Sequence, residues 1–432
     1  MKKIIIAVCA MVVAASASAQ SRADGFYKDL FMDSGTKLNT YQDLPAVKLL
    51  NLKMERICTY DNVVGMKHDP TEFELGLMKS IFAGSETDAN GVLLYPDGAP
   101  RFKVIYVNGG KSASHGEAVT AGGRDNIRKF FANGGSYVGT CAGAYFCSKG
   151  VRRSDGSSKE YETYLGIFPA LVRGTALSTS ATGLTVEKKC PLLKYYDFGG
   201  DYQIDSVRHN GGCYLPEDNI PEGTELLMRY IGDTLKLKNS IHKTVNAWAY
   251  KASEQGGRIV VTGSHPERMI SGDRLQMFAG MIRYAIEGNG KPQIKAELES
   301  GVARRMVKET KDNVPESTCI GDKQYHHFTI EVPKGAKELE VELKSMPGRD
   351  NYDLFIYASD KGFAFNDVAQ WFNVLEGVDK KLVIPAPKAG KMYISVFCDT
   401  TVDTVDTEFG ERYTGRIDVL NGVPYIVKAT VK

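Results

Sequence analysis

Several kinds of pattern are missing from this sequence of 432 residues, and each absence narrows the function. There is no C-x-x-C pair and no spacing of cysteine or histidine typical of a metal site. After the first twenty residues, no apolar run is long enough to cross a bilayer. Neither sign of charge dominates, with 54 lysines and arginines against 52 aspartates and glutamates. We therefore expect no metal or other cofactor, no nucleic-acid partner and no insertion into a membrane.

The start of the chain predicts export. Lys2 and Lys3 precede an apolar stretch, Ile4–Ala15, that is too short for a membrane helix, and residues 17–19 read Ala-Ser-Ala. We expect a signal peptide over residues 1–19 and a mature protein in the periplasm or outside the cell. Cleavage of this peptide would remove Lys2 and Lys3 and leave equal numbers of basic and acidic residues.

The cysteines fit an exported protein with at least one free thiol. One of the 8 cysteines lies in the signal segment, so an odd number remains. If Cys141 is the free thiol, Cys190 with Cys213 and Cys319 with Cys398 are plausible pairs, although the sequence fixes no connectivity.

One stretch, Ser136–Phe146, has the features of a catalytic turn. An apolar pair leads into Gly139-Thr-Cys-Ala-Gly143, after which a helix-compatible segment begins. This is the G-x-nucleophile-x-G pattern of a nucleophile elbow, with Cys141 in the nucleophile position. The glycines would supply room and backbone freedom, and the following helix would favour the thiolate. The alternative is a structural cysteine in a glycine-rich turn.

Around this stretch, short apolar strands alternate with helical segments, which predicts a parallel sheet with crossover helices. The expected strands are Glu55–Tyr60, Gly91–Tyr95, Lys103–Val107 and Arg258–Thr262, and the expected helices are Thr71–Phe82, Glu117–Ala132 and Arg274–Glu287. Between Ser154 and Gly257 we expect the later, partly antiparallel strands with long loops. These segments form one α/β domain over residues 54–287, after a lead-in of uncertain structure at residues 20–53.

Farther along the chain, the apolar period changes to two. A charged segment at residues 288–315 is expected to be a linker. The strands expected after it are His327–Val332, Glu338–Leu343, Tyr352–Tyr357, Lys381–Ile384, Met392–Phe397 and Tyr413–Val419. This pattern predicts an all-β sandwich over residues 316–432. The pair His326-His327 lacks further ligands and is interpreted as surface.

A cysteine nucleophile needs a base, and the base needs a group that orients it. His265 follows a buried strand, as Cys141 does, so both can reach the same edge of the sheet. Glu267 stands two residues further and can hold the imidazole across the turn at Pro266. We therefore predict a catalytic group of Cys141, His265 and Glu267.

The remaining candidates surround this group. The N–H of Ala142 and one N–H of the Asn108-Gly109-Gly110 loop are predicted oxyanion donors, because glycine lets backbone approach a substrate closely. His209 either lines the substrate pocket or is a turn residue. His115 follows the glycine loop and could contact substrate, but we expect it to be a solvated loop residue.

Two sets of motifs resemble a known family. Gly139-Thr-Cys-Ala-Gly143 with Gly263-Ser-His-Pro-Glu267 is similar to the class I glutamine amidotransferase-like superfamily. Gly139–Phe146 with Asn108-Gly-Gly110 and His209-Asn-Gly-Gly212 more closely resembles the domain at the N-terminus of eukaryotic biotin–protein ligases, which also occurs alone in bacteria. The resemblance covers about residues 54–287. It implies a flavodoxin-like α/β sandwich and a Cys-His-Glu triad.

The C-terminal strands resemble a pre-peptidase C-terminal domain, through Tyr352–Tyr357 and Ala389–Val396. Such domains accompany secreted hydrolases. The resemblance implies an accessory role, such as contact with a glycan or a peptide.

Together these features predict an exported cysteine-dependent hydrolase of amide bonds, with peptide or cell-wall amides as candidate substrates. We expect a stand-alone hydrolase rather than an ammonia-channelling subunit, because no synthase or ligase sequence follows and export removes the ATP-driven acceptor chemistry. Two alternatives remain: a binding protein with an inactive site, and a thiol redox sensor in which Cys141 forms a sulfenic acid.

Overall fold

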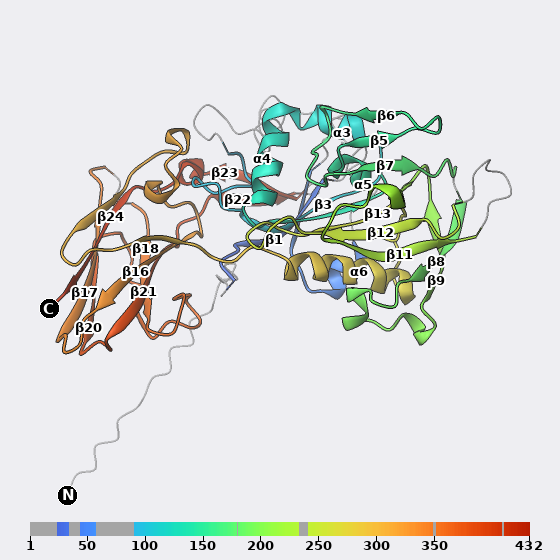
Figure 1. Cartoon of the computed structure of the whole chain (residues 1–432). Coiled ribbons are helices and arrows are strands. Elements are labelled where there is room, and N and C mark those ends of the chain that lie inside the picture. The colour runs from blue at the N-terminus through green and yellow to red at the C-terminus, as the bar shows by residue number, and fades with distance from the viewer. Residues whose placement is uncertain are drawn as a thin grey trace, which may run out of the picture.

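The computed structural model describes residues 24–33, 44–57, 90–178, 180–232, 241–348, 351–407 and 410–432. The predicted signal peptide at residues 1–19 and the helix predicted at Thr71–Phe82 lie outside these residues. Within them, an α/β part is followed by a β-sandwich, which lies at one side of it (Figure 1). The predicted fold class is therefore confirmed.

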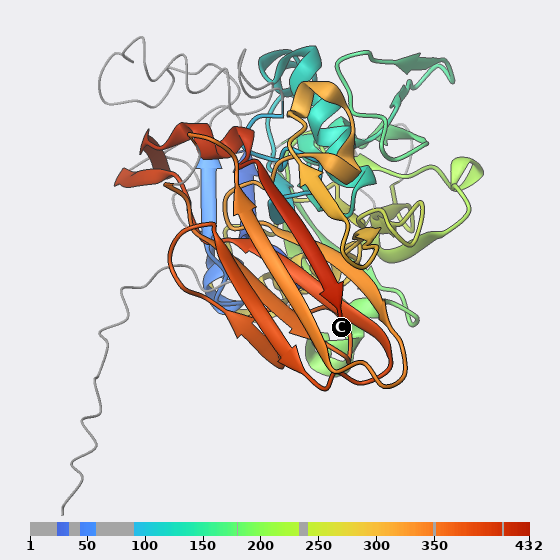
Figure 2. The ribbon, with the colours of Figure 1, turned by 90° about the vertical axis from the view of Figure 1, so that its left-hand side faces the viewer.

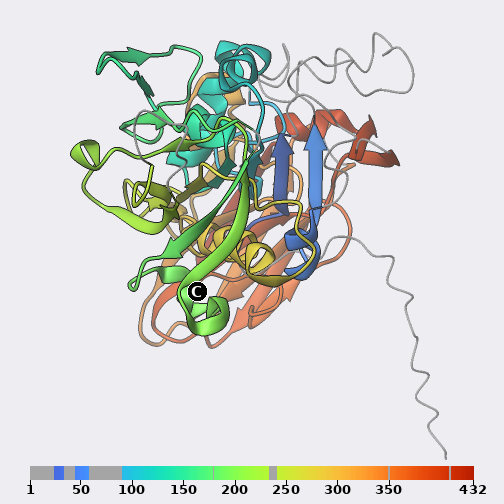
Figure 3. The same ribbon diagram turned by 90° about the vertical axis from the view of Figure 1, so that its right-hand side faces the viewer.

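A nine-stranded sheet forms the centre of the α/β part, in the order β2-β1-β3-β4-β13-β12-β11-β8-β9. The first five of these strands are parallel, and the last four run antiparallel to their neighbours. The strands are β1 (Lys28–Asp33), β2 (Met54–Ile57), β3 (Phe102–Val107), β4 (Ser136–Thr140), β8 (Ser180–Val186), β9 (Gln203–His209), β11 (Thr224–Ile231), β12 (Val245–Tyr250) and β13 (Ile259–Thr262). The antiparallel end lies away from the sandwich (Figure 3).

Helices cover both faces of this sheet. α3 (Ser112–Ala118), α4 (Thr120–Ala132) and α5 (Ala142–Cys147) lie on one face, and α6 (Gly272–Glu287) lies on the other, next to α1 (Pro45–Leu49) (Figure 1). Because side chains alternate between the faces of a strand, β3 sends Ile105 and Val107 toward α3–α5 and Val104 and Tyr106 toward α6. Among the residues described, no helix combines the length and hydropathy needed to span a membrane.

The α/β part differs from the sequence predictions in two places. Residues 91–95 form a turn with an isolated bridge between Leu94 and Pro100, so the predicted strand is wrong. The lead-in segment contains β1, which lies inside the sheet between β2 and β3. A small second sheet lies above the main one in Figure 1, with the strand order β10-β7-β5-β6. Its strands are β5 (Gly150–Arg152), β6 (Ser158–Glu160), β7 (Leu171–Gly174) and β10 (Cys213–Tyr214).

The C-terminal part packs a five-stranded sheet, β14-β16-β21-β18-β19, on a four-stranded sheet, β15-β24-β17-β20 (Figure 2). Its strands, including the hairpin β22–β23, are β14 (Ile294–Glu297), β15 (Ala303–Met306), β16 (Tyr325–Val332), β17 (Glu338–Ser345), β18 (Leu354–Ser359), β19 (Trp371–Asn373), β20 (Lys380–Pro385), β21 (Gly390–Cys398), β22 (Asp403–Thr407), β23 (Gly410–Gly415) and β24 (Tyr425–Val431). Strands β14 and β15 come from the segment expected to be a linker, so that expectation is wrong for their residues.

The histidine pair at the start of the sandwich is buried, and its interpretation as surface is wrong. His326 and His327 lie on β16, an inner strand between β14 and β21. Nδ1 of His326 lies 3.0 Å from the hydroxyl of Tyr425, and Nδ1 of His327 lies 2.7 Å from the hydroxyl of Ser395. Burial lowers the pKa of His327 to about 3, so both the packing and the charge state are those of core residues.

A buried ion pair joins the sandwich to the sheet. Arg101, immediately before β3, pairs with Asp322, and only 2% of each side chain is exposed. Nε of Arg101 also donates to the carbonyl oxygen of Leu94 at 3.0 Å. Nearby, Lys295 of β14 pairs with Asp97. These contacts lie at the amino end of β3.

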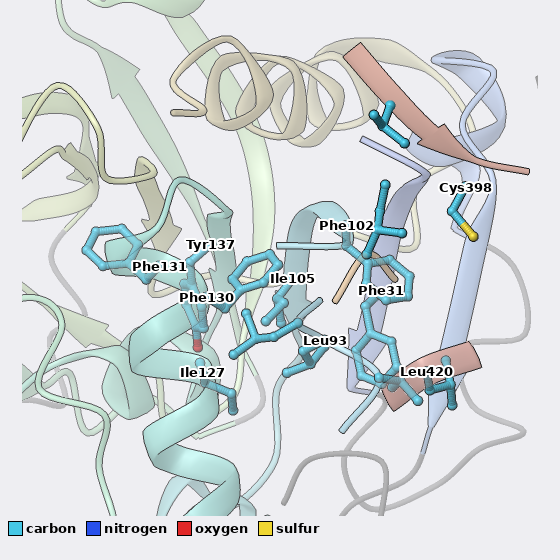
Figure 4. Close-up of a cluster of buried hydrophobic side chains, with 14 of the residues drawn as sticks. Phe31, Leu93, Phe102, Ile105, Ile127, Phe130, Phe131, Tyr137, Cys398 and Leu420 are labelled. Carbon is cyan, nitrogen blue, oxygen red and sulfur yellow. The ribbon is translucent and has the colours of Figure 1, made fainter. Parts of the chain in front are cut away.

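Apolar packing continues across the same junction. Phe31 of β1 and Phe102 of β3 belong to one cluster with Cys398 and Leu420 of the sandwich (Figure 4). The two rings meet edge to face, with centroids 5.3 Å apart. The sandwich is therefore attached through a shared core as well as through charge.

Candidate functional site

Cys141 lies on a sharp turn between β4 and α5. Its φ of 49° and ψ of −103° belong to a region that residues other than glycine rarely adopt. The N–H of Cys141 donates to the carbonyl oxygen of Thr262 at 2.9 Å, which ties the turn to the end of β13. The side chain therefore stands at the carboxyl ends of two neighbouring parallel strands.

The two glycines of the elbow are required by close packing. A Cβ at Gly139 would lie 2.7 Å from the carbonyl carbon of Gly143, and a Cβ at Gly143 would lie 2.1 Å from the carbonyl oxygen of Val107. Neither glycine has a positive φ, whereas Cys141 does. The glycines thus supply room, as the sequence predicts, but the unusual backbone conformation belongs to the cysteine itself.

His265 and Glu267 form a hydrogen-bonded pair next to the thiol. Nδ1 of His265 lies 2.9 Å from Oε1 of Glu267, and their side chains are 15% and 1% exposed. Cys141 lies close enough to His265 to raise the pKa of the imidazole. Since Nδ1 faces the carboxylate, Nε2 is the nitrogen left for the sulfur.

The charge state of His265 follows from these partners. Burial alone would lower its pKa, but the hydrogen bonds to Cys141 and Glu267 and the negative charge of both partners outweigh burial and raise it to about 10. The N–H of His265 donates to the carbonyl oxygen of Arg208 at 2.8 Å, which fixes the backbone of the residue. The site is therefore organised to hold an imidazolium beside the sulfur.

The predicted glycine loop closes on this imidazole. A Cβ at Gly109 would lie 2.3 Å from Cε1 of His265, so the loop backbone is in direct contact with the ring. Asn108 is buried, whereas Gly110 is exposed and has a φ of 148°. Ala142 is the first residue of α5, where N–H groups have no carbonyl partner within the helix. The structure thus places Gly109 against His265 and Ala142 next to Cys141, with Asn108 and Gly110 on either side of Gly109 in the loop.

The remaining contact of the thiol is with the loop after β9. Sγ of Cys141 lies 3.6 Å from the carbonyl oxygen of Asn210, and only 5% of the cysteine is exposed. Gly212, in the same loop, has no room for a Cβ, which would lie 1.8 Å from the carbonyl oxygen of Gly263. The loop therefore packs directly over the thiol and the segment that carries His265.

His209 does not line the site. Its side chain is fully buried, with Nε2 3.0 Å from the hydroxyl of Thr182 and Nδ1 3.3 Å from the hydroxyl of Ser264. Burial, together with the positive charge of His265, lowers its pKa to about 4, so it is neutral. His209 therefore contacts Ser264, the residue next to His265, and the predicted contact of His209 with substrate is wrong.

His115 is another histidine that the sequence places incorrectly. It is buried in α3, with its ring stacked on that of Phe146 at a centroid distance of 6.3 Å. The amphipathic pattern of α3 is too short to reveal this burial from the sequence.

The suggested disulfides do not form. Cys190, Cys213 and Cys398 are buried free thiols, which excludes both pairings. Cys147 is also buried, and its thiol donates to the carbonyl oxygen of Ala144 at 3.3 Å. Burial raises the pKa of each of these thiols. In the part of the chain that the structure describes, no three histidine, cysteine, aspartate or glutamate side chains gather as metal ligands would.

A pocket of about 670 Å³, not foreseen from the sequence, opens beside the loop over the thiol. Its lining includes Tyr145, Arg152, Arg153, Arg173, Gly211 and Tyr214. The hydroxyl of Tyr145 donates to the carbonyl oxygen of Gly211 at 3.2 Å. The arginines come from β5, the turn after it and β7, and no sequence motif links them.

Comparison with known proteins finds similarity over part of the chain. Residues 96–284 match the family model described as "Biotin-protein ligase, N terminal". An uncharacterized protein of Chlamydia muridarum (strain MoPn / Nigg) is 29% identical over 120 residues, covering 26% of this chain and 44% of that protein. The chain thus spans less than half the length of that curated relative.

Two solved structures are similar to part of the chain. A glutamine amidotransferase is 18% identical, covering 56% of this chain and 89% of its own, with a TM-score of 0.32. The pre-peptidase C-terminal domain of a collagenase from Bacillus anthracis is 10% identical, covering 33% of this chain and all of its own, with a TM-score of 0.18.

The family match includes the elbow, the glycine loop and the His-Pro-Glu segment. Over residues 96–284 the chain is similar to the biotin–protein ligase N-terminal family, and the resemblance to this family predicted from its motifs is confirmed.

Proposed function

We propose that the protein hydrolyses an amide bond through a thioester on Cys141. The observation that carries this proposal is the His265–Glu267 pair, with Nδ1 and Oε1 2.9 Å apart, beside a cysteine on a strained elbow. A structural cysteine would need neither partner. A nucleophile needs both, because its proton must be taken up by a base that is held in one orientation.

In the first half of the reaction, Sγ of Cys141 attacks the carbonyl carbon of the substrate. The sulfur attacks as a thiolate, because its proton already resides on Nε2 of His265, where Glu267 stabilises the imidazolium through Nδ1. The C–N bond then breaks, and His265 returns the proton to the leaving amine. This leaves a thioester and a neutral imidazole.

In the second half, water attacks the thioester and gives a proton to His265. The C–S bond breaks, the acid product leaves, and the site regains the thiolate beside the imidazolium. In both halves the carbonyl oxygen becomes negative, and the N–H groups of Ala142 and of the Gly109 loop are the proposed donors to it. Loss of one such donor typically costs about 10²–10³ in rate.

We further propose that the enzyme acts outside the cytoplasm, on peptide or cell-wall amides. The support is the signal-like start of the sequence together with a β-sandwich of the kind seen beside secreted hydrolases. A fusion of residues 1–30 to a reporter enzyme, assayed in cell fractions, would test export. Retention of the reporter in the cytoplasm would contradict it.

The hydrolase proposal is tested by turnover of a panel of amides and peptides, with mass spectrometry of the intact protein to trap the thioester. We expect Cys141→Ala to abolish turnover and the adduct. Cys190→Ala is the matched control, since Cys190 is also a buried thiol of the α/β part but lies in the core against α6. Equal turnover by Cys141→Ala and the parent would refute the proposal.

The two alternatives give different outcomes in the same experiment. A binding protein would retain a ligand in Cys141→Ala and show no turnover in the parent. A redox sensor would show reversible oxidation of Cys141 by peroxide and no thioester. Either result would replace the hydrolase proposal.

A further inference from the structure

We propose that the arginine-lined pocket beside Cys141 binds a carboxylate of the substrate, so that the enzyme selects amides carrying an acidic group near the scissile bond. This inference rests on the hydrolase function proposed above and adds the class of its substrate. It follows from the position of the pocket, its unbalanced charge and the direction of one arginine.

The pocket and the thiol share one stretch of backbone. The carbonyl oxygen of Asn210 contacts Sγ of Cys141 at 3.6 Å, and the next residue, Gly211, lines the pocket. Consecutive Cα atoms are about 3.8 Å apart, so the pocket begins one residue from the sulfur. Tyr145, one turn after Cys141 in α5, lies on the pocket side and holds this stretch through its hydroxyl.

The charge of the pocket is positive and only partly compensated. Arg152 pairs with Asp218. Asp155 also lines the pocket, but its carboxylate accepts from the N–H and hydroxyl of Ser157 in its own turn, at 2.8 and 2.6 Å. In the described part of the chain, neither Arg153 nor Arg173 has a carboxylate within ion-pair distance.

Arg173 is the residue best placed to bind a ligand. It lies on β7 after Val172, which is fully buried in the core, so the alternation of the strand directs Arg173 away from the core and toward the pocket. Its register partner on β10 is Tyr214, which lines the same pocket. The next residue, Gly174, packs so tightly on Tyr145 that a Cβ would lie 3.0 Å from its hydroxyl oxygen.

These features favour a carboxylate. A guanidinium presents a planar fork that binds a carboxylate through two parallel hydrogen bonds. Three arginines against the two carboxylates of Asp155 and Asp218 leave the pocket with a net charge of about +1. This charge matches a carboxylate better than a doubly charged phosphate. A volume of about 670 Å³ accommodates an amino acid or short peptide, within the range of common ligand sites.

The test uses alkylating probes that report on the pocket without requiring turnover. Bromoacetyl-glycine and bromoacetyl-β-alanine carry a carboxylate, and their primary amides are neutral counterparts. In each reaction the sulfur of Cys141 displaces bromide to form a C–S bond. The rate constants at Cys141 are measured by peptide mass spectrometry, and the acid-to-amide ratio is compared with that of glutathione.

We expect this ratio to exceed that of glutathione and to fall about tenfold in Arg173→Gln, the loss typical of a charge-assisted hydrogen bond. Arg153→Gln should give a smaller fall. Arg305→Gln, at an exposed position on β15 of the sandwich, is the matched control and should change nothing. A ratio equal to that of glutathione, or one unaffected by Arg173→Gln, would overturn the pocket assignment.

The design separates failure of this inference from failure of the hydrolase proposal. Normal reaction of Cys141 with the neutral amides, without preference for the acids, would reject only the pocket. If Cys141 reacts with none of the probes, the pocket is tested by modification of Arg173 with phenylglyoxal. Protection by glutarate would support carboxylate binding. Protection by inorganic phosphate alone, or no protection, would overturn it.

Discussion

Replacement of Gly109 by alanine should uncouple His265 from Cys141 while leaving the fold intact. The new Cβ would lie 2.3 Å from Cε1 of His265. Carbon atoms in contact are about 3.5 Å apart or more, so the ring has to move by roughly 1.2 Å. The 2.9 Å bond between Nδ1 and Glu267 does not survive a movement of that size. Misplacement by about 1 Å costs on the order of 10² in rate.

Two measurements follow the displacement. The imidazole of His265 is titrated by NMR, and its resonance is assigned by comparison with His265→Gln. We expect its pKa to fall from about 10 toward its ordinary value of 6.5, because the raised value depends on the bonds to Cys141 and Glu267. Turnover, or alkylation of Cys141 at neutral pH, should fall about 10²-fold.

A matched glycine provides the control. At Gly280, on α6, the nearest atoms to an added Cβ lie 3.5 Å away, which is ordinary contact. Gly280→Ala should keep full activity and gain up to about 1 kcal/mol of stability, since alanine is the better helix former. The reasoning is refuted if Gly109→Ala keeps both the pKa of His265 near 10 and the rate of the parent.

Three further changes test other parts of the structure. The pKa of His265 is raised from 6.5 to about 10, so its contribution to folding stability is complete below pH 6.5 and is lost as the pH rises to about 10. Denaturant unfolding measured across this range should show the loss of stability, and Glu267→Gln should make the loss smaller. Gly143→Ala places a Cβ 2.1 Å from a backbone oxygen and should lower the free energy of unfolding by about 1–3 kcal/mol or more, measured against Gly280→Ala. Arg101→Met leaves Asp322 buried without its partner and should cost about 3–5 kcal/mol in thermal unfolding; a loss below 1 kcal/mol would contradict the role of the pair in holding the sandwich.

The site was the most predictable part of the molecule because each of its members follows a buried strand. The apolar runs before Cys141 and His265 identify strand ends, and parallel strand ends meet at one edge of a sheet. The strain at Cys141 could be located only to the turn, since a sequence does not say which residue adopts the positive φ.

Other features were hidden because their cause lies in distant residues. His326 and His327 look exposed in the sequence, yet strands β14 and β21 flank them and Tyr425 and Ser395 satisfy their Nδ1 atoms. Strands β14 and β15 escape detection because they lie at sheet edges and, apart from Met306, have exposed or half-buried side chains, which removes the period-two signal.

The pocket was hidden for a related reason. Arg152 and Arg173 stand on different strands of a small sheet, and only the pairing of β7 with β5 and β10 places their side chains around one volume. A polar segment with scattered arginines resembles any solvated loop until that pairing is known.

The backbone at Cys141 restricts how this protein can change over evolutionary time. At a φ of 49°, a side chain branched at Cβ meets severe crowding, whereas an unbranched one is tolerated. Serine can therefore occupy the position and keep a nucleophile, whereas threonine is disfavoured there by the shape of its side chain. The turn thus favours exchange between cysteine and serine over exchange with the β-branched threonine.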